Sequence, residues 1–394
     1  MIVDEIATLA PGDEAEAGAM IAEARGRRET LDVVGGGSRA GLGRPSEGKR
    51  RLSSARLDGI VFHEPAEMVL RAKAGTPLAV VEAALEAHGQ MLPFEPIDSR
   101  ALYGGGEPTV GGLVATNASG PRRVSAGAAR DSVIGLRLVN GRGEAIMTGG
   151  QVMKNVAGLD LVKLNCGALG TLGLLTEATF KLLPKPESEA TIVVRRRDDA
   201  GAVAAMTAAL GSPFGVSGAA MLSPGMGREF SRTFLRVEGF AASVDHRADK
   251  LLALLGADNV LKGDDSRRLW RAVRDADFLA EPRERAVWRV SVRPSRAVEF
   301  LVRLGPRALA HFFDCGGGLV WLSTGATPAD AAAVRAALAP SGGHATLARA
   351  PDALRAAVDV FQPQPPAVMA LTRRVKAAFD PDGVFNPGRM YAGI

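Results

Sequence analysis

Glycine gathers at three places in the first half of the chain, at residues 35–43, 104–120 and 167–173. Apolar, strand-like residues lie beside each cluster, so main-chain N–H groups could reach a ligand with no side chain between them. Phosphate oxygens suit such groups, because a hydrogen bond to a charged oxygen contributes about 1.5–3 kcal/mol. One cluster alone is as typical of a turn as of a ligand site. Three in one region favour the ligand site.

Two common nucleotide motifs do not fit the clusters. Gly35, Gly37 and Ala40 satisfy the dinucleotide pattern G-x-G-x-x-A after a strand, but that pattern must open directly into a helix. Gly41, Gly43 and Pro45 follow instead and exclude one. The Walker pattern fails as well, since no glycine is followed by Lys and Ser or Thr at the required place. The sequence therefore favours another arrangement of glycine loops.

No catalytic residue can be assigned from the side chains. Of the five histidines, only His311 lies in a plausible strand of the second half, and beside Phe312 it fits a packed structural residue better than a base. Arg122 and Arg123 adjoin a glycine cluster and could meet a carboxylate or phosphate, although surface arginine is the simpler interpretation. Trp270, Trp288 and Trp321 are expected to be core or interface anchors.

Composition excludes several classes of function. The net charge of +5 comes from arginines mixed with acids, and no basic cluster carries stacking aromatics, so nucleic acid is not an expected partner. The two cysteines, Cys166 and Cys315, lack the paired spacing of a metal site, and we predict no metal. No signal peptide or transmembrane segment is evident. We expect a cytoplasmic protein, with any membrane association arising through partners.

The glycine clusters follow predicted strands and helices. A strand at 31–34 leads into the first cluster, and a second strand at about 68–74 leads to a helix with Thr76 as N-cap, Pro77 at its first position and Gly89 as its end. Asn140-Gly141 between two apolar runs predicts a β-hairpin over 131–147. The strand at about 174–183 follows the third cluster and ends at Pro184.

This pattern predicts an α+β protein of three parts. Residues 1–186 hold the glycine clusters, and 187–345 form a separate α+β domain in which strands alternate with helices. Residues 346–394, with a helix at about 366–379, are too few to fold alone and must dock on another part of the chain.

Several segments in a fixed order resemble the vanillyl-alcohol oxidase (PCMH-type FAD-binding) family. They are GGGS at 35–38, LEAHG at 85–89, PTVGGLVATNASGPRR at 108–123, RDSVIGLRLVNGRGE at 130–144, KNVAGLD at 154–160, GALGTLGLLTEATFKL at 167–182 and FDPDGVFNPGRM at 379–390. The resemblance implies a two-subdomain FAD-binding domain, a cap domain, and a C-terminal segment that returns to the FAD domain. Both ends of the chain are covered.

Within that family, GPRR at 120–123 and CGGGLVWL at 315–322 resemble the FAD-binding subunits of glycolate oxidases. This implies a flavoprotein subunit that works with a larger FAD-binding catalytic subunit and an iron–sulfur subunit in oxidising the 2-hydroxy acid glycolate to glyoxylate. Carried over by position, the cofactor-binding residues are Gly35, Gly36, Gly37, Ser38, Arg39, Pro108, Thr109, Gly111, Gly112, Thr116, Ser119, Gly120, Gly173, Leu174 and Leu175.

Two departures from the family pattern refine the expectation. Covalent members attach the flavin to a histidine in the first loop, where this chain has Ser38, Arg39 and Ala40, so the resemblance implies non-covalent FAD. The histidine-rich signature of the larger catalytic subunit is missing. Two other functions stay open: a self-sufficient FAD-dependent 2-hydroxy-acid or alditol dehydrogenase, and a non-catalytic assembly module that keeps the FAD fold.

Overall fold

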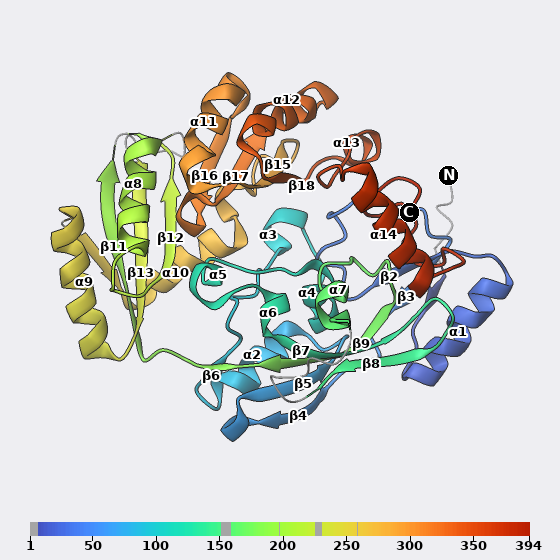
Figure 1. Cartoon of the computed structure of the whole chain (residues 1–394). Coiled ribbons are helices and arrows are strands. Elements are labelled where there is room, and N and C mark those ends of the chain that lie inside the picture. Colours follow the sequence, from blue (N-terminus) through green and yellow to red (C-terminus); the bar gives the residue numbers. More distant parts are fainter. Residues whose placement is uncertain (1–6, 151–158, 197, 225–230, 258) are drawn as a thin grey trace. The chain divides into compact units, whose positions relative to one another are not determined.

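A computed structural model describes residues 7–150, 159–196, 198–224, 231–257 and 259–394 (Figure 1). Contacts within the chain divide it into two compact units. Unit 1 comprises 1–118, 128–184 and 363–394, and unit 2 comprises 119–127 and 185–362. The predicted boundary at 345 differs from this division because β18 (His344–Arg349) belongs to the sheet of unit 2. Part of the KNVAGLD motif, 154–158, lies outside the described residues.

Unit 1 is built on a five-stranded antiparallel sheet and a smaller parallel sheet. The larger sheet has the order β4 (Ile60–Glu64), β5 (Val69–Lys73), β9 (Leu174–Lys181), β7 (Val133–Val139), β8 (Ala145–Gly149). The smaller has the order β1 (Thr8–Leu9), β3 (Arg50–Ser53), β2 (Leu31–Val34), and β6 (Gln90–Met91) pairs separately with β10 (Leu183–Pro184). The helices are α1 (Glu14–Gly26), α2 (Leu78–Glu86), α3 (Arg100–Tyr103), α4 (Val110–Thr116), α6 (Ala129–Ser132), α7 (Leu161–Asn165) and α14 (Pro366–Phe379).

The local predictions for unit 1 agree with most of these elements. Residues 131 and 132 of the predicted hairpin belong to α6, and the strand predicted at about 174–183 is divided into β9 and β10, which lie in different sheets. The hairpin of β7 and β8 turns at Asn140, whose Oδ1 accepts hydrogen bonds from Arg142 N and Glu144 N. At α2 the N-cap is Pro77 and not Thr76. The Thr76 hydroxyl instead bonds to the main chain of Gly59, so this threonine joins two loops rather than capping the helix.

Two apolar clusters hold unit 1 together. The larger places Val81 of α2 and Leu113 of α4 against Leu70 and Phe180 of the five-stranded sheet. The smaller combines Ile21 of α1 and Leu52 of β3 with Val384 and Phe385 near the C-terminus, among other residues. Each of these side chains is almost fully excluded from water, and burying one such side chain contributes about 1.5–3 kcal/mol. The C-terminal segment is therefore part of the core of unit 1.

Unit 2 is an eight-stranded antiparallel sheet with helices packed on it. The order is β14 (Asn259–Lys262), β11 (Ser188–Arg196), β13 (Ser231–Gly239), β12 (Val216–Leu222), β16 (Ala310–Asp314), β17 (Leu319–Thr324), β15 (Ala286–Ser291), β18. One apolar cluster includes residues of α8 (Asp199–Leu210), α9 (Ala241–Leu255), α11 (Pro294–Leu304) and α12 (Pro328–Leu338). The remaining helices are α5 (Arg123–Ala126), α10 (Gly263–Asp275) and α13 (Asp352–Ala357). No described helix in either unit combines the length and apolar character needed to span a bilayer.

Candidate functional site

The first glycine cluster presents open main-chain donors. Among the described residues, none accepts a hydrogen bond from the N–H groups of Gly35, Gly36 or Gly37, which directly follow β2. Gly37 has a φ of +80°, a conformation that side-chain-bearing residues rarely adopt. An added Cβ at Gly36 would lie 2.0 Å from the carbonyl oxygen of Glu107. The loop thus needs glycine both for its shape and for its contact with the second cluster.

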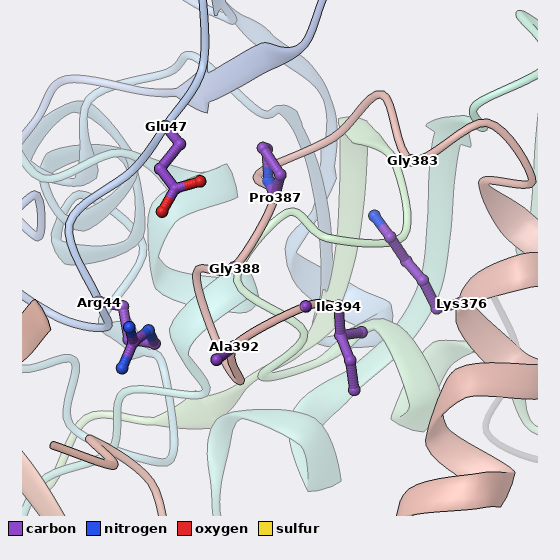
Figure 2. Close-up of a pocket in the computed structure, with 9 residues that line it drawn as sticks. Arg44, Glu47, Lys376, Gly383, Pro387, Gly388, Ala392 and Ile394 are labelled. Carbon is purple, nitrogen blue, oxygen red and sulfur yellow. The ribbon is translucent and has the colours of Figure 1, made fainter. Parts of the chain in front are cut away.

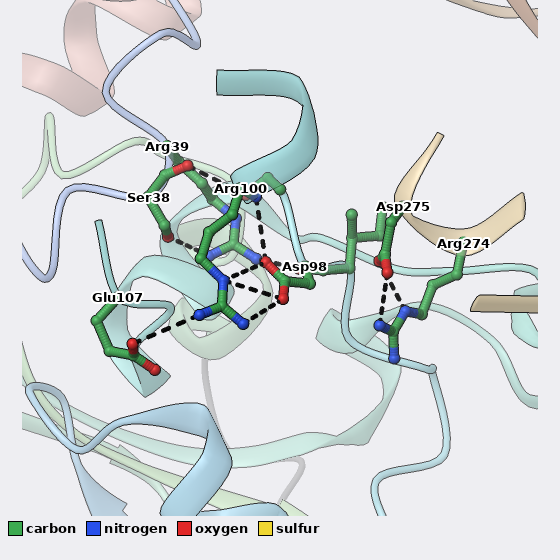
Figure 3. Close-up of polar contacts among 9 residues, drawn as sticks. Ser38, Arg39, Asp98, Arg100, Glu107, Arg274 and Asp275 are labelled. Atoms are coloured by element: carbon green, nitrogen blue, oxygen red, sulfur yellow. Dashed lines mark hydrogen bonds and ion pairs between the residues drawn. The ribbon is translucent and has the colours of Figure 1, made fainter. Parts of the chain in front are cut away.

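Direct hydrogen bonds join the first cluster to the second. Glu107 N donates to Gly36 O at 2.8 Å, and the Ser99 hydroxyl donates to Ser38 O at 3.2 Å. Arg39 donates through Nη2 to Ile97 O at 2.7 Å, which ties the loop to the segment before α3 (Figure 3). In the same view Arg100 binds Asp98 through two nitrogens and lies 3.7 Å from Glu107. The predicted residues Gly35–Arg39 therefore lie beside the residues that lead into Pro108 and Thr109.

Residues 109–112 of the second cluster form the start of α4, and the N–H groups of Gly111 and Gly112 already have acceptors. Gly111 N donates to Ala74 O at 2.7 Å, and Gly112 N donates to the Thr109 hydroxyl at 3.3 Å. An added Cβ at Gly111 would lie 2.9 Å from the Ala74 Cβ, so this glycine allows α4 to pack closely on the chain after β5. Thr116 at the other end of α4 donates to Gly112 O at 2.8 Å. These residues shape the site rather than offering open donors.

The third cluster meets the C-terminal end of α4. Gly167 N donates to Val114 O at 3.0 Å, and Leu169 N donates to Ala115 O at 2.8 Å. The parts of the three clusters that belong to unit 1 are thus connected through α4 and the first loop.

The predicted residues at the end of the third cluster belong to the sheet. Leu174 and Leu175 pair with Val139 and Leu138 of β7, and both side chains are buried in the two apolar clusters. An added Cβ at Gly173 would lie 2.7 Å from Val139 O. The structure therefore gives Gly173, Leu174 and Leu175 a packing role in the β7–β9 ladder.

Sequence reasoning missed a buried ion pair in the C-terminal segment. Lys376 of α14 donates through Nζ to Asp380 Oδ2 at 2.6 Å, Phe385 O at 2.8 Å and Thr171 O at 2.7 Å. Asp380 is 1% exposed and also accepts from the N–H groups of Val384 and Phe385. Burial lowers the pKa of Lys376, while Asp380 opposes that shift. This pair fastens the C-terminal segment to the third cluster.

Asn386 and Arg389 extend this attachment to the first cluster. The Asn386 side chain accepts from Val33 N at 2.8 Å and donates to Leu169 O at 2.6 Å, so it bridges β2 and the third cluster. Arg389 donates through Nη2 to Ala40 O at 2.8 Å. The only sequence signal for these contacts was the segment FDPDGVFNPGRM, whose resemblance indicated that it returns to the first domain but not what each residue does.

A cavity of about 280 Å³ lies between the residues after the first loop and the C-terminal segment (Figure 2). Arg44 and Glu47 line it from the first segment, and Lys376, Gly383, Pro387, Gly388, Ala392, Gly393 and Ile394 line it from the second. None of the predicted cofactor residues is among them. Two of its lining residues therefore follow the first loop closely in sequence, but the cavity is not the predicted cofactor site.

Ser119 and Gly120, also predicted to bind cofactor, lie in unit 2. The segment that carries them is anchored there by Arg122, which donates to Glu238 Oε1 at 2.7 Å and Oε2 at 3.2 Å. Arg236 adds a second cation, with its Nε 3.3 Å from Glu238 Oε2, and stacks on Trp270. Arg122 is thus engaged by a buried carboxylate of its own unit. The sequence had suggested a ligand carboxylate or phosphate as its partner.

Two reactive residue types have defined surroundings. His311 of β16 lies with Nε2 2.8 Å from Asp199 Oδ2, and both side chains are mostly buried. Burial raises the pKa of Cys166 to about 12, which keeps this thiol protonated and unreactive at neutral pH. In unit 1, the rings of His63 and His88 contact each other edge to face.

A flavin dinucleotide fits the first cluster on structural grounds. Three consecutive N–H groups without an acceptor among the described residues match the acceptor oxygens of a diphosphate. The close approach of Gly36 to Glu107 shows that the loop shape depends on the missing side chain.

Comparisons with known proteins bear on the family and the cofactor. Residues 6–149 match the family model described as FAD binding domain. The chain is 35% identical over 365 residues to glycolate oxidase subunit GlcE of Escherichia coli (strain K12), which covers 92% of this chain and 93% of the relative. It is 32% identical over 149 residues to glycolate oxidase subunit GlcD of Bacillus subtilis (strain 168), covering 38% of this chain and 30% of the relative.

The fold has solved counterparts. The structure of p-cresol methylhydroxylase with substrate bound superposes with a TM-score of 0.74 over 98% of this chain and 88% of that chain, at 13% identity. The predicted α+β, PCMH-type FAD-binding fold is therefore confirmed, and FAD is confirmed as the cofactor class. With the similarity to GlcE extending over nearly the whole chain, this protein belongs to the GlcE family of FAD-binding oxidoreductase subunits.

Proposed function

We propose that this chain is the FAD-binding subunit of a glycolate oxidase complex and supports the oxidation of glycolate to glyoxylate. The supporting observation is the run of open N–H groups at Gly35–Gly37, joined to the other two glycine clusters in unit 1. Similarity to a glycolate oxidase subunit over 92% of the chain supports the substrate class. Bound FAD would supply an acceptor for the hydride equivalent that leaves the hydroxy acid.

In this proposal unit 1 is the FAD-binding domain and unit 2 the cap domain. Gly35, Gly36 and Gly37 hold the diphosphate through their N–H groups, and Thr109, Gly111 and Gly112 shape the adjacent wall. The FAD is held non-covalently, because the first loop has Ser38, Arg39 and Ala40 in place of a histidine. Ser119 and Gly120 are contributed by the segment of unit 2 that Arg122 anchors.

The partners in this proposal are a larger FAD-binding catalytic subunit and an iron–sulfur subunit, with the complex in the cytoplasm. A multi-subunit complex is supported by the two relatives, each of which is described as a subunit of glycolate oxidase.

One observation favours the alternative of a self-sufficient 2-hydroxy-acid dehydrogenase. The Asp199 carboxylate holds His311 at 2.8 Å, and such a contact orients an imidazole for proton transfer. In that alternative, His311→Gln removes glycolate-dependent dye reduction by the isolated chain while bound FAD is retained.

Purification of the isolated chain and of the reconstituted complex tests the proposal. We expect a yellow protein that releases FAD on denaturation and reduces dye with glycolate only when the partner subunits are added. A colourless protein that takes up no added FAD would falsify it. Turnover by the isolated chain would favour the self-sufficient enzyme, and bound FAD that neither glycolate nor partners can reduce would favour an assembly module.

A further inference from the structure

Residues 118–129 connect α4 to α6, and both of these helices belong to unit 1. Asn117 accepts a hydrogen bond through Oδ1 from Arg130 N at 3.0 Å, and this bond closes the base of the connection. The residues in its middle, 119–127, belong to unit 2. The segment 119–127 therefore starts and ends at unit 1 in the chain but folds with unit 2.

Local hydrogen bonds shape this segment without attaching it to a sheet. Arg123 N donates to Gly120 O at 3.1 Å, and Ser125 N donates to Arg122 O at 2.9 Å. Both bonds close within the segment, and α5, the helix that it contains, has only four residues. A helix this short is unstable by itself, because the first turn fixes several residues for each hydrogen bond that it forms. The position of the segment must therefore come from contacts with the rest of the chain.

A buried contact between an arginine and a carboxylate provides such an attachment. Arg122 donates through Nη2 to Glu238 Oε1 at 2.7 Å and through Nε to Glu238 Oε2 at 3.2 Å. The Arg122 side chain is 12% exposed, and the Glu238 side chain, on β13, is 8% exposed. Two parallel hydrogen bonds fix the orientation of the guanidinium as well as its distance, and burial reduces screening by salt. This contact therefore holds the segment in one position on β13.

A second arginine keeps Glu238 in place. Arg236 is 1% exposed, and its Nε lies 3.3 Å from Glu238 Oε2 and donates to Ser217 Oγ at 3.2 Å. Its guanidinium also stacks on Trp270, at 4.6 Å from the ring centroid. Because Arg236 would stay beside Glu238 if Arg122 were removed, the carboxylate would keep a cation. Loss of Arg122 should therefore release the segment without leaving an unpaired charge in the sheet.

We propose that Arg122 and Glu238 are positioning residues for FAD, because their contact places Ser119 and Gly120 where the cofactor meets them. The proposal rests on the proposed function, in which Ser119 and Gly120 contact FAD. Both of these residues are buried, and they lie within three positions of Arg122, a span of at most about 11 Å of chain. Over so short a span, a shift of Arg122 displaces the main chain of both. Arg122 and Glu238 thus act on FAD through the segment.

FAD titration of three variants tests this proposal. Arg122→Met removes the contact and keeps the apolar stem of the side chain, whereas Arg122→Lys keeps the charge and loses the two-point geometry. The matched control is Arg307→Met, because Arg307 Nη1 contacts Asp330 Oδ1 at 2.5 Å within unit 2 and outside the segment. We expect Arg122→Met to bind FAD at least about tenfold more weakly than the wild type, with Arg122→Lys between the two. Arg307→Met should bind FAD as the wild type does.

Urea denaturation of the FAD-free samples accompanies the titration, and we expect Arg122→Met and Arg307→Met to unfold at similar urea concentrations. Three results overturn the proposal. The first is wild-type FAD affinity in Arg122→Met. The second is an equal loss of FAD affinity in Arg122→Met and Arg307→Met, because the contact then acts only through general stability. The third is an Arg122→Lys variant as weak as Arg122→Met, which removes the ion pair as the cause.

The wild-type titration separates this inference from the proposed function. A wild-type chain that binds no FAD contradicts both. A wild-type chain that binds FAD, together with an unaffected Arg122→Met, contradicts the positioning role alone.

Discussion

The first and second glycine clusters are similar in sequence but use their main chains in different ways. The N–H groups of Gly35, Gly36 and Gly37 have no acceptor among the described residues. Those of Gly111 and Gly112 are bound to Ala74 O and to the Thr109 hydroxyl. Glycine in the first cluster thus leaves donors open, whereas in the second it permits close packing of α4. A count of glycines does not distinguish these roles, and substitutions do.

The largest effect is expected at Gly36. An added Cβ at Gly36 would lie 2.0 Å from Glu107 O. Gly36→Val should therefore push the first loop away from the second glycine cluster and abolish FAD binding. Visible absorbance of the purified protein and titration with FAD measure this. Gly37→Ala is the matched control, since its Cβ meets nothing within 4 Å and its φ of +80° adds a cost of about 1–2 kcal/mol. Wild-type FAD affinity in Gly36→Val would contradict the assignment of the first loop.

A smaller but still large effect is expected from breaking the buried ion pair. Lys376→Met leaves Asp380 charged and unpaired in the core, which lowers the free energy of unfolding by about 3–5 kcal/mol. FAD affinity should also fall, by at least about tenfold, because Thr171 loses its anchor to the C-terminal segment.

Lys163→Met is the matched control for the ion pair, because Lys163 and Asp160 form an exposed pair that is worth no more than about 1 kcal/mol. Chemical denaturation and FAD titration are carried out on both variants. Unchanged FAD affinity in Lys376→Met would show that the C-terminal segment stabilises unit 1 without positioning the third cluster.

A modest effect is expected in the second cluster. An added Cβ at Gly112 would lie 3.3 Å from the Thr109 hydroxyl and 3.7 Å from Arg39 Nη1, so Gly112→Ala should keep FAD affinity within a few-fold of the wild type. Gly111→Ala, with contacts of 2.9 and 3.0 Å to Ala74, should destabilise unit 1 by about 1–3 kcal/mol. Loss of FAD from Gly112→Ala would erase the contrast between the two clusters.

The smallest effect on FAD is expected at Glu14, which contacts none of the three clusters. A hydrogen bond from Arg137 holds the pKa of Glu14 below its ordinary value, with a further contribution from Thr176. A carboxyl whose pKa is lowered on folding stabilises the protein above its unfolded pKa, near roughly 4.3, and loses this contribution as pH falls through the lower folded pKa.

Glu14→Gln should therefore reduce the loss of stability as pH falls below the unfolded pKa of about 4.3, without changing FAD affinity at pH 7. Urea denaturation across this pH range measures the first effect, and FAD titration measures the second. If the acid dependence of the variant equals that of the wild type, the Glu14–Arg137 contact does not contribute as inferred.

Local elements followed well from the sequence. The strand at 31–34 and the helix at 366–379 have the predicted bounds, and the hairpin around Asn140 formed as expected. Short-range forces determine such elements, since side-chain periodicity and turn residues act within a few positions. The ordered motifs likewise led to the family and to FAD, both of which the comparisons support.

The sequence alone thus determined the α+β elements, the glycine clusters and the cofactor class. Tertiary structure decided which N–H groups stay open, because their acceptors come from distant residues. The N–H of Gly111 donates to Ala74 O, whereas Gly36 accepts from Glu107 N through its carbonyl oxygen and its own N–H has no acceptor among the described residues. It also decided that Asn386 bridges Val33 and Leu169, and that Ser119 and Gly120 fold with unit 2. A hydrogen bond between residues far apart in the chain leaves no periodic trace in either segment, so only folding brings it about.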